Sequence, residues 1–261
     1  MNTNVAHQAR VYDYLLGGKD NYDVDREAAH RAFAAYPGGV AGASALARAN
    51  RAFLGRAVHY LASDAGIGQF LDIGTGIPTA NNTHEVAQRV APESRIVYVD
   101  KDPIVLAHAR ALLSGTREGA THYIDADLRD PDKILQEAAG TLDLGQPVAI
   151  MLVLILHMLA DEEDPYQVVA RLLEAVPVGS YLVIAHAAND IQRELVEANE
   201  VISKRMTEPV FPRSYPEVAR FFDGLELVEP GVVPVNQWRP GVGVPGAGSE
   251  FAIHCGVGRK V

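Results

Sequence analysis

Short apolar segments alternate with helical segments from Gly68 onward. We expect strands at residues 70–73, 95–100, 122–124, 148–154 and 181–185. The fourth segment is apolar without alternation, which is typical of a central parallel strand covered on both faces. Strands that are joined by helices pair in parallel through right-handed crossovers. The alternation therefore predicts an open, doubly wound α/β sheet with helices on both faces.

The first predicted strand leads into a glycine turn. Asp72 interrupts the apolar run, Gly74 and Gly76 follow it, and a helix with an apolar stripe opens soon after. Glycine lets the backbone approach a ligand closely, and the first N–H groups of a helix have no partner within the helix. The turn is thus a candidate ligand site, although a tight turn that binds nothing has the same pattern.

The acidic composition narrows the class of partner. The 261 residues carry a formal net charge of -10, which argues against general binding to nucleic acid or to an anionic membrane. We expect a small-molecule substrate, no nucleic acid and no membrane contact. The most apolar stretch, 147–160, is too short to span a bilayer. A single cysteine, Cys255, and an amino terminus without a secretory pattern predict a cytoplasmic protein.

Polar residues stand at or just after the carboxyl ends of the predicted strands. They are Asp72, Asp100, Asp125, Asp127, His157 and His186. In open parallel sheets these ends lie together, and ligands bind outside them. Acids at three consecutive strand ends are costly to place together unless a ligand with hydroxyls, amines or positive charge faces them. We therefore expect such a ligand at this edge of the sheet.

The glycine turn favours one class of nucleotide over another. Asp100, at the end of the second strand, can accept hydrogen bonds from ribose hydroxyls, as in dinucleotide sites. A pyrophosphate fingerprint needs a third glycine where this chain has Thr79. Asp72 would repel a pyrophosphate, but it can orient an amino group such as that of S-adenosylmethionine (SAM). Phosphate loops that end in Gly-Lys-Ser/Thr are absent from the sequence, which argues against a kinase or GTPase.

The later part of the chain predicts further elements. A long helix is expected at 191–206, and another begins at Asp102. Two final strands are expected at 225–228 and 250–257, and the connection between them, rich in Pro and Gly, is predicted to lie on the surface.

The strand-end motifs resemble those of a known enzyme class. The run 72–76, with Asp100 and the pair Asp127-Leu128, resembles the successive SAM-contacting motifs of class I methyltransferases. A closer likeness, to a bacterial family of uncharacterised S-adenosyl methyltransferases, is carried by residues 10–22, 46–54, 72–79, 82–87 and 126–131. The resemblance implies a Rossmann-like sheet of seven strands in the order 3-2-1-4-5-7-6, with the last strand antiparallel. It places this α/β domain at residues 67–261.

The resemblance also implies roles for individual residues. Gly74 and Gly76 would let the backbone approach the methionine part of SAM, Asp100 would hold the ribose, and Asp127 with Leu128 would contact the adenine. The whole predicted cofactor site comprises Asp72, Gly74, Thr75, Gly76, Asp100, Lys101, Asp127, Leu128, Tyr14 and Lys19.

Residues 1–66 are predicted to form a helical amino-terminal extension of three helices, at 5–16, 24–36 and 44–63. The stretch 10–22 mixes aromatic, charged and glycine residues, which suits a lid over a ligand, although a capped helix end gives the same mixture.

Several polar residues of this extension are candidate ligand contacts. Tyr12 and Tyr14 could cover the sulfonium or a substrate ring, because an aromatic face attracts cations. Lys19 and Arg48 could meet a carboxylate, and Asn21 or Asn50 could hold the loop. Core packing for the tyrosines and solvent exposure for Lys19 remain open as alternatives.

His157, which follows the fourth strand, is the candidate catalytic residue. It could serve as a base or as a hydrogen-bonding partner of the substrate, and a structural role is equally open. His186, after the fifth strand, is a weaker candidate for the substrate side. A base is optional, since positioning of the acceptor supplies much of the acceleration. Metal-ligand spacing is absent from the sequence, so no metal is expected.

The leading hypothesis is a SAM-dependent methyltransferase that acts on a small molecule, with the amino-terminal helices as lid and substrate wall. A non-catalytic SAM-binding or regulatory protein is the alternative. An NAD-dependent oxidoreductase is disfavoured by Asp72 and Thr79.

Overall fold

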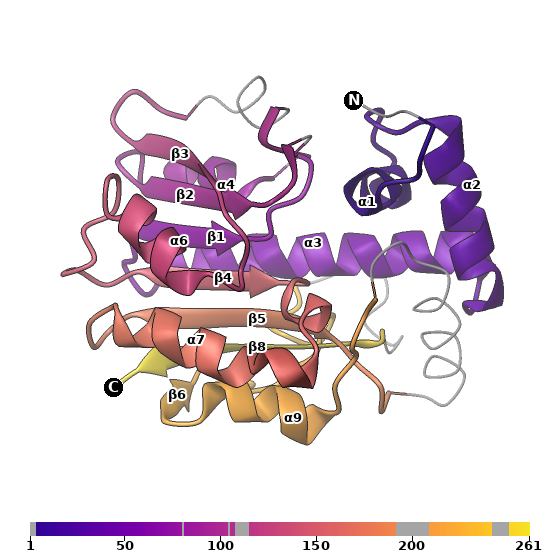
Figure 1. Ribbon diagram of the computed structural model, residues 1–261. Helices are drawn as coiled ribbons and strands as arrows, with labels where there is room; N and C mark the ends of the chain where they lie inside the picture. Colours follow the sequence, from indigo (N-terminus) through magenta and orange to yellow (C-terminus); the bar gives the residue numbers. More distant parts are fainter. Residues whose placement is uncertain (1–3, 80, 104, 108–114, 192–208, 242–250) are drawn as a thin grey trace.

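A mixed sheet with helices on both faces forms the centre of the molecule (Figure 1). The computed structural model describes residues 4–79, 81–103, 105–107, 115–191, 209–241 and 251–261. The helix expected at 191–206 lies almost entirely outside these residues, as does most of the helix expected after Asp102.

Five strands of the sheet are parallel, and their order confirms the predicted fold class. They are β1 (Gln69–Ile73), β2 (Arg95–Asp100), β3 (Ala120–Asp125), β4 (Ala149–Val153) and β5 (Tyr181–Ala187). β8 (Ile253–Lys260) pairs antiparallel with β5, and β6 (Leu225–Leu227) pairs antiparallel with β8. The order β3-β2-β1-β4-β5-β8-β6 is the predicted one, with β8 in the place of the seventh strand.

The connection between β6 and β8 differs from the prediction. It contains an additional short strand, β7 (Val233–Pro234), which pairs with β8 and makes the sheet eight-stranded. The described part of this connection is also not confined to the surface, because Trp238 is fully buried against the rings of Phe53 and Tyr60. Arg56 fixes it there by donating to the carbonyl oxygens of Val235 and Trp238.

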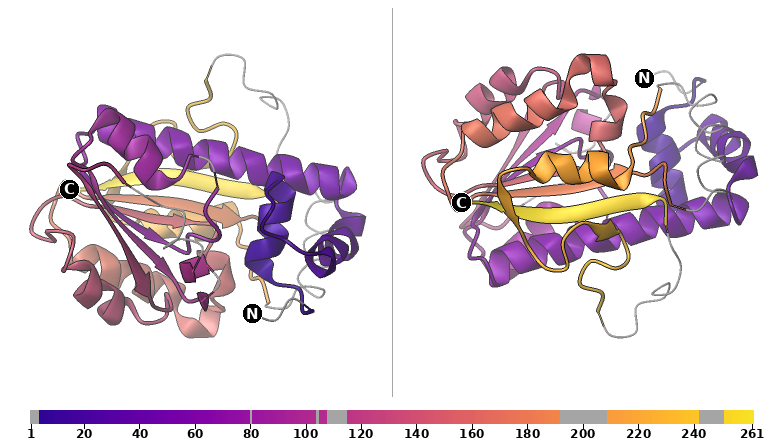
Figure 2. Two further views of the ribbon diagram at one scale, coloured as in Figure 1. Left: turned by 90° about the horizontal axis from the view of Figure 1, so that it is seen from above. Right: turned by 90° about the horizontal axis from the view of Figure 1, so that it is seen from below.

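Helices cover the two faces of the sheet (Figure 2). On one face lie α3 (Gly39–Ser63) and α4 (Thr83–Val90), and on the other lie α6 (Pro131–Ala138), α7 (Pro165–Glu174) and α9 (Tyr215–Ala219). Short 3-10 turns occur at η1 (Phe33–Ala35), η2 (Leu156–Met158), η3 (Asp161–Glu163) and η4 (Arg220–Phe222). Each face encloses its own apolar cluster, so β4 is buried along its whole length.

The amino-terminal helices α1 (Gln8–Leu16) and α2 (Asp23–Ala32) lie beyond the sheet, near the first turns of α3 (Figure 1). A fully buried ion pair joins them, with Arg10 Nε 2.8 Å from Asp25 Oδ2. Asp25 also accepts from the backbone N–H groups of His7 and Tyr22. This carboxylate therefore fixes α1 on α2 and closes the capping box that starts α2.

In the described ranges, no helix combines the length and the apolar character that a bilayer crossing requires.

Candidate active site

A cavity of about 440 Å³ lies at the carboxyl ends of the parallel strands. Its walls come from the segments that follow β1 to β4, from α1 and from α3. Of the residues predicted for the site, these line it: Tyr12, Asp72, Gly74, Thr75, Gly76, Asp100, Lys101, Asp127, Leu128 and His157. Residues at or just after the ends of β1, β2, β3 and β4 are thus brought to one place, whereas the strand-end residues Asp125 and His186 do not line the cavity.

The glycine turn after β1 requires glycine at both positions. Gly74 and Gly76 have φ values of +77° and +64°, in the left-handed region that side chains disfavour. A Cβ atom at Gly74 would also lie 2.6 Å from the side chain of Ile155. Next to Gly76 there is open space, since nothing lies within 4 Å of the same position. The turn thus presents bare backbone to the cavity.

Asp100 holds this turn in place. One of its carboxylate oxygens accepts from the backbone N–H of Gly76 at 3.0 Å, and the other accepts from that of Asp102 at 2.9 Å. Burial raises the pKa of Asp100, while these two hydrogen bonds act in the opposite direction. A carboxylate has about four lone-pair sites, so this group can still accept from ligand hydroxyls.

Asp72 lies buried beneath the turn. Its Oδ2 accepts from the Thr83 hydroxyl at 2.6 Å, which joins β1 to the first turn of α4. Burial raises the pKa of Asp72 to about 6, and both the Thr83 hydrogen bond and the positive charge of Arg51 oppose that shift.

We expect the stability difference between the wild-type protein and Asp72→Asn to change with pH. The raised pKa, about 6 against an ordinary 3.8, means that between these values the folded state binds more protons than the unfolded state. The stability that the aspartate contributes is full below the lower value and is lost as the pH rises through the higher one. At about 1.4 kcal/mol per pKa unit, the wild type should lose about 2 kcal/mol relative to the variant between pH 4 and pH 7. Urea unfolding at both pH values measures this, and parallel pH profiles would contradict it.

Asp127 belongs to an ion-pair network that lines the cavity. Its carboxylate lies 3.2 Å from Arg129 Nη1 and 3.9 Å from Lys101 Nζ. Arg129 continues to Glu163 at 2.5 Å and donates to the carbonyl oxygen of Met158 at 3.1 Å. Arg129 was not predicted as a site residue, although it lies in the motif around Asp127. It connects the segment after β3 to η2 and η3.

The amino-terminal helix α1 forms one wall of the cavity. The Tyr12 hydroxyl accepts from Asn50 Nδ2 at 3.0 Å, which joins α1 to α3. Gln8 Nε2 lies 3.4 Å from Met158 Sδ, and His7 Nε2 lies 3.1 Å from Asp102 Oδ2. These contacts connect α1 with the segments after β4 and β2.

Sequence reasoning missed several lining residues. They are His7, Gln8, Arg51, Asp102 and Met158, while Asn50, which was expected to hold the loop after the first helix, also lines the cavity. Asp102 and Met158 lie shortly after predicted strand ends. The others belong to no strand-end motif, so only the docking of α1 and α3 identifies them.

Five predicted site residues do not line the cavity. Tyr14 instead contacts His30 of α2 at 3.2 Å, because a side chain two residues from Tyr12 points to about the opposite side of a helix. Asn21 donates to Asp13 and to the Gly18 carbonyl, so it holds the loop after α1. The remaining three are Lys19 and Arg48, which are exposed, and His186, which is fully buried.

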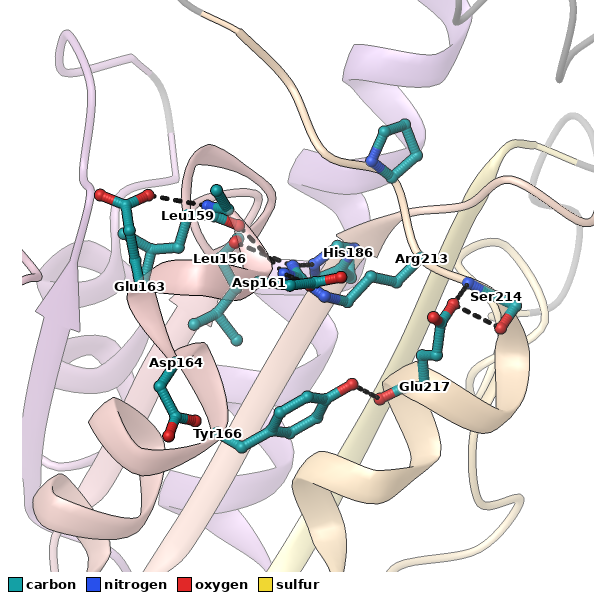
Figure 3. Close-up of polar contacts among 12 residues, drawn as sticks. Leu156, Leu159, Asp161, Glu163, Asp164, Tyr166, His186, Arg213, Ser214 and Glu217 are labelled. Carbon is teal, nitrogen blue, oxygen red and sulfur yellow. Dashed lines mark hydrogen bonds and ion pairs between the residues drawn. The ribbon is translucent and has the colours of Figure 1, made fainter.

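His186 and Arg213 lie next to Leu156, Leu159 and Asp161 (Figure 3). The ring centroid of His186 lies 6.0 Å from that of His157. His186 Nε2 faces Arg213 Nη1 at 3.0 Å, and its Nδ1 faces the Ala187 carbonyl at 2.8 Å. Burial lowers the pKa of His186 well below its ordinary value, so the ring is neutral. Both ring nitrogens of His186 have hydrogen-bonding partners within the protein, so its role is structural.

Arg213 is the centre of this arrangement. Its guanidinium donates to the carbonyl oxygens of Leu156 at 3.2 Å and Leu159 at 3.0 Å, and it lies 2.7 Å from Asp161 Oδ1 (Figure 3). These bonds hold both ends of η2 and the residue that starts η3. No strand-end or glycine motif marks Arg213 in the sequence.

His157 lies in η2 with 7% of its surface exposed. Burial and the nearby charge of Arg213 lower the pKa of His157 to about 4, so its imidazole is neutral at pH 7. Its Nδ1 is buried and makes no hydrogen bond to the residues that the structure describes. A neutral imidazole can accept a hydrogen bond from a ligand.

The residues around the turn fit SAM better than a dinucleotide. A pyrophosphate would bring negative charge next to Asp72 and Asp100, whereas an amino group and ribose hydroxyls are donors that carboxylates accept. The open space at Gly76 admits a ligand to the backbone. The cavity volume falls in the range of small-molecule sites, roughly 300–1,000 Å³. Over the described part of the chain, no group of three or more His, Cys, Asp or Glu could hold a metal ion.

Comparisons with known proteins also indicate SAM as the ligand. The chain matches the S-adenosyl methyltransferase family over residues 1–261. A DUF574 family protein from Streptomyces avermitilis is 45% identical, with a TM-score of 0.92 over 99% of both chains. A provisionally assigned methyltransferase from Thermobifida fusca is 41% identical, with a TM-score of 0.88 over 98% of this chain and 95% of its own.

More distant structures share only the fold. Mitomycin 7-O-methyltransferase is 16% identical, with a TM-score of 0.54 over 84% of this chain and 56% of its own. None of the curated proteins matches. The full-length family match and the two similar structures together show that the chain belongs to the S-adenosyl methyltransferase family, whose cofactor is SAM and whose reaction is methyl transfer.

Proposed function

We propose that the protein transfers a methyl group from SAM to a small-molecule acceptor inside the cavity. The observation that carries the proposal is that the glycine turn, Asp72, Asp100 and Asp127 line a single cavity together with Tyr12 and His157. When bound, SAM supplies an electrophilic methyl group on a sulfonium. The residues of this chain bind it, orient it and exclude water.

The cofactor half of the cavity consists of the segments that follow β1, β2 and β3. Here Gly74 and Gly76 offer backbone to the methionine part, and Asp100 accepts from the ribose hydroxyls. Asp127 and Leu128 face the adenine, while Thr75 and Lys101 complete the wall. We assign no ligand contact to Tyr14, Lys19, Asn21, Arg48 or His186, which lie elsewhere.

The acceptor half consists of parts of α1, α3 and η2. His157 would accept a hydrogen bond from the acceptor group and hold it toward the methyl group, because its imidazole is neutral at pH 7. The helical extension, residues 1–66, acts as lid and substrate wall, with α1 in direct contact with η2 through Gln8 and Met158. A net charge of -10 disfavours nucleic acid as the acceptor. The single Cys255 supports a cytoplasmic location.

Calorimetry with SAM, its demethylated product S-adenosylhomocysteine (SAH) and NAD tests the cofactor part of the proposal. We expect heat of binding for SAM and SAH and none for NAD, because a pyrophosphate would lie against two carboxylates. Binding of NAD in place of SAH would overturn the proposal. Transfer of labelled methyl groups from SAM to extract metabolites tests catalysis, and binding without any transfer would favour a regulatory SAM-binding protein.

A further inference from the structure

The methionine part of SAM places two opposite charges side by side. Its ammonium and its carboxylate are bonded to the same carbon atom, so a site that holds both needs an anion and a cation close together. Asp72, which lines the cavity, supplies the anion. The two residues predicted to meet a carboxylate, Lys19 and Arg48, are exposed and do not line the cavity. The cation must therefore come from another residue.

Among the described residues, the lysine and arginine side chains that line the cavity are Arg51, Lys101 and Arg129. Lys101 Nζ and Arg129 Nη1 lie 3.9 Å and 3.2 Å from the carboxylate of Asp127, which follows β3. In the function proposed above Asp127 faces the adenine, at the opposite end of the cofactor. Arg51 is thus the remaining candidate for the methionine end.

Arg51 and Asp72 are both joined to the start of α4. Arg51 Nη2 donates to the carbonyl oxygen of Asn81 at 3.1 Å and to Asn82 Oδ1 at 3.4 Å. Asp72 Oδ2 accepts from the hydroxyl of Thr83, the next residue, at 2.6 Å. Because these contacts involve three successive residues, the guanidinium and the carboxylate lie at the same place on the cavity wall.

The charge of Arg51 acts on two other residues that line the cavity. Burial raises the pKa of Asp72 to about 6 and also raises the pKa of Tyr12, and the positive charge of Arg51 opposes both shifts. Asp72 follows from β1 and Tyr12 from α1, so the guanidinium acts where these two parts of the wall meet. An anion in this part of the cavity would be attracted by the same charge.

From this arrangement we infer that Arg51 binds the carboxylate of the cofactor and so selects ligands that carry the amino-acid part. The inference rests on the function proposed above. A guanidinium has five N–H donors and commonly pairs with a carboxylate through two of them. Arg51 and Asp72 together then match the two opposite charges of the methionine part.

Calorimetry with SAM and decarboxylated SAM tests the inference on the full-length protein, because the two ligands differ only in the carboxylate. We expect Arg51→Gln to weaken SAM binding by at least about 10-fold, the loss of one charge-assisted pair, and not to weaken binding of decarboxylated SAM. Equal weakening of both ligands would show that Arg51 only supports the turn, and unchanged SAM binding would show no contact; either result overturns the inference. Failure of the wild type to bind SAM and SAH overturns the proposed function instead.

Two further variants complete the test. Arg48 lies on the same helix but is exposed and outside the cavity, so Arg48→Gln removes the same charge and should leave SAM affinity within about twofold. Arg51→Lys keeps the positive charge and should bind SAM at least about 3-fold more tightly than Arg51→Gln. An equal loss in Arg48→Gln, or no recovery in Arg51→Lys, would contradict a direct contact between Arg51 and the carboxylate.

Discussion

Asp100→Ala should weaken SAH binding by at least about 100-fold, because a ribose offers two hydroxyl donors and each hydrogen bond to a carboxylate contributes about 1.5–3 kcal/mol. The same carboxylate accepts from the backbone of Gly76 and Asp102, so its loss also loosens the turn that faces the methionine part. Calorimetric titration of SAH into the wild-type and variant proteins measures the effect.

Asp125→Ala is the matched control. Asp125 pairs in register with Asp100 at the end of the neighbouring strand, yet it is exposed and does not line the cavity. Its removal should leave SAH affinity within about twofold, since surface substitutions usually change free energies by less than about 0.5 kcal/mol. An equal loss of SAH affinity in the two variants would indicate a general electrostatic effect. It would contradict a specific role of Asp100 in binding the ribose.

Arg213→Met should lower the free energy of unfolding by about 3 kcal/mol, because it leaves buried acceptors without a donor at about 1–3 kcal/mol each. The acceptors are the carbonyl oxygens of Leu156 and Leu159 and the Nε2 of His186 (Figure 3). Removal of a buried charge offsets part of this loss. Urea unfolding measures the change, and amide hydrogen exchange should show faster opening of residues 156–161.

Arg220→Met serves as the comparison. Arg220 lies exposed over the ring of Tyr166, 4.1 Å from its centroid, and makes no contact with η2. An exposed cation–π pair contributes about 0.5–1 kcal/mol, so this variant should lose less than about 1 kcal/mol. If Arg213→Met were no more destabilising than Arg220→Met, η2 would not depend on the guanidinium.

Much of the fold could be predicted because its signals are local. The uninterrupted apolar run of β4 indicates a strand buried on both faces, and the turn at Gly74 indicates where a strand gives way to a helix. β7 could not be predicted, because its two residues lie in a Pro- and Gly-rich stretch and become a strand only by pairing with β8. The burial of Trp238 likewise depends on α3, about 180 residues away along the chain.

The predictable part of the site follows from strand geometry. Parallel strands bring their carboxyl ends together, so Asp72, Asp100 and Asp127 could be grouped without a structure. The choice between Tyr12 and Tyr14 could not be made, because it depends on which face of α1 docks against α3. Arg213 could not be linked to His157 either, because the two lie far apart in sequence and meet only in the folded protein.

The buried cluster under the amino-terminal helices has a consequence for the order of folding. Leu15 and Ala47 pack in one cluster with Ala188 and Ala252, so α1 and α3 rest on segments that are synthesised much later. Contacts of such long sequence separation form slowly, because the loops they close are large. The α1 wall of the cavity therefore gains part of its support only after the segment that leads into β8 has been synthesised.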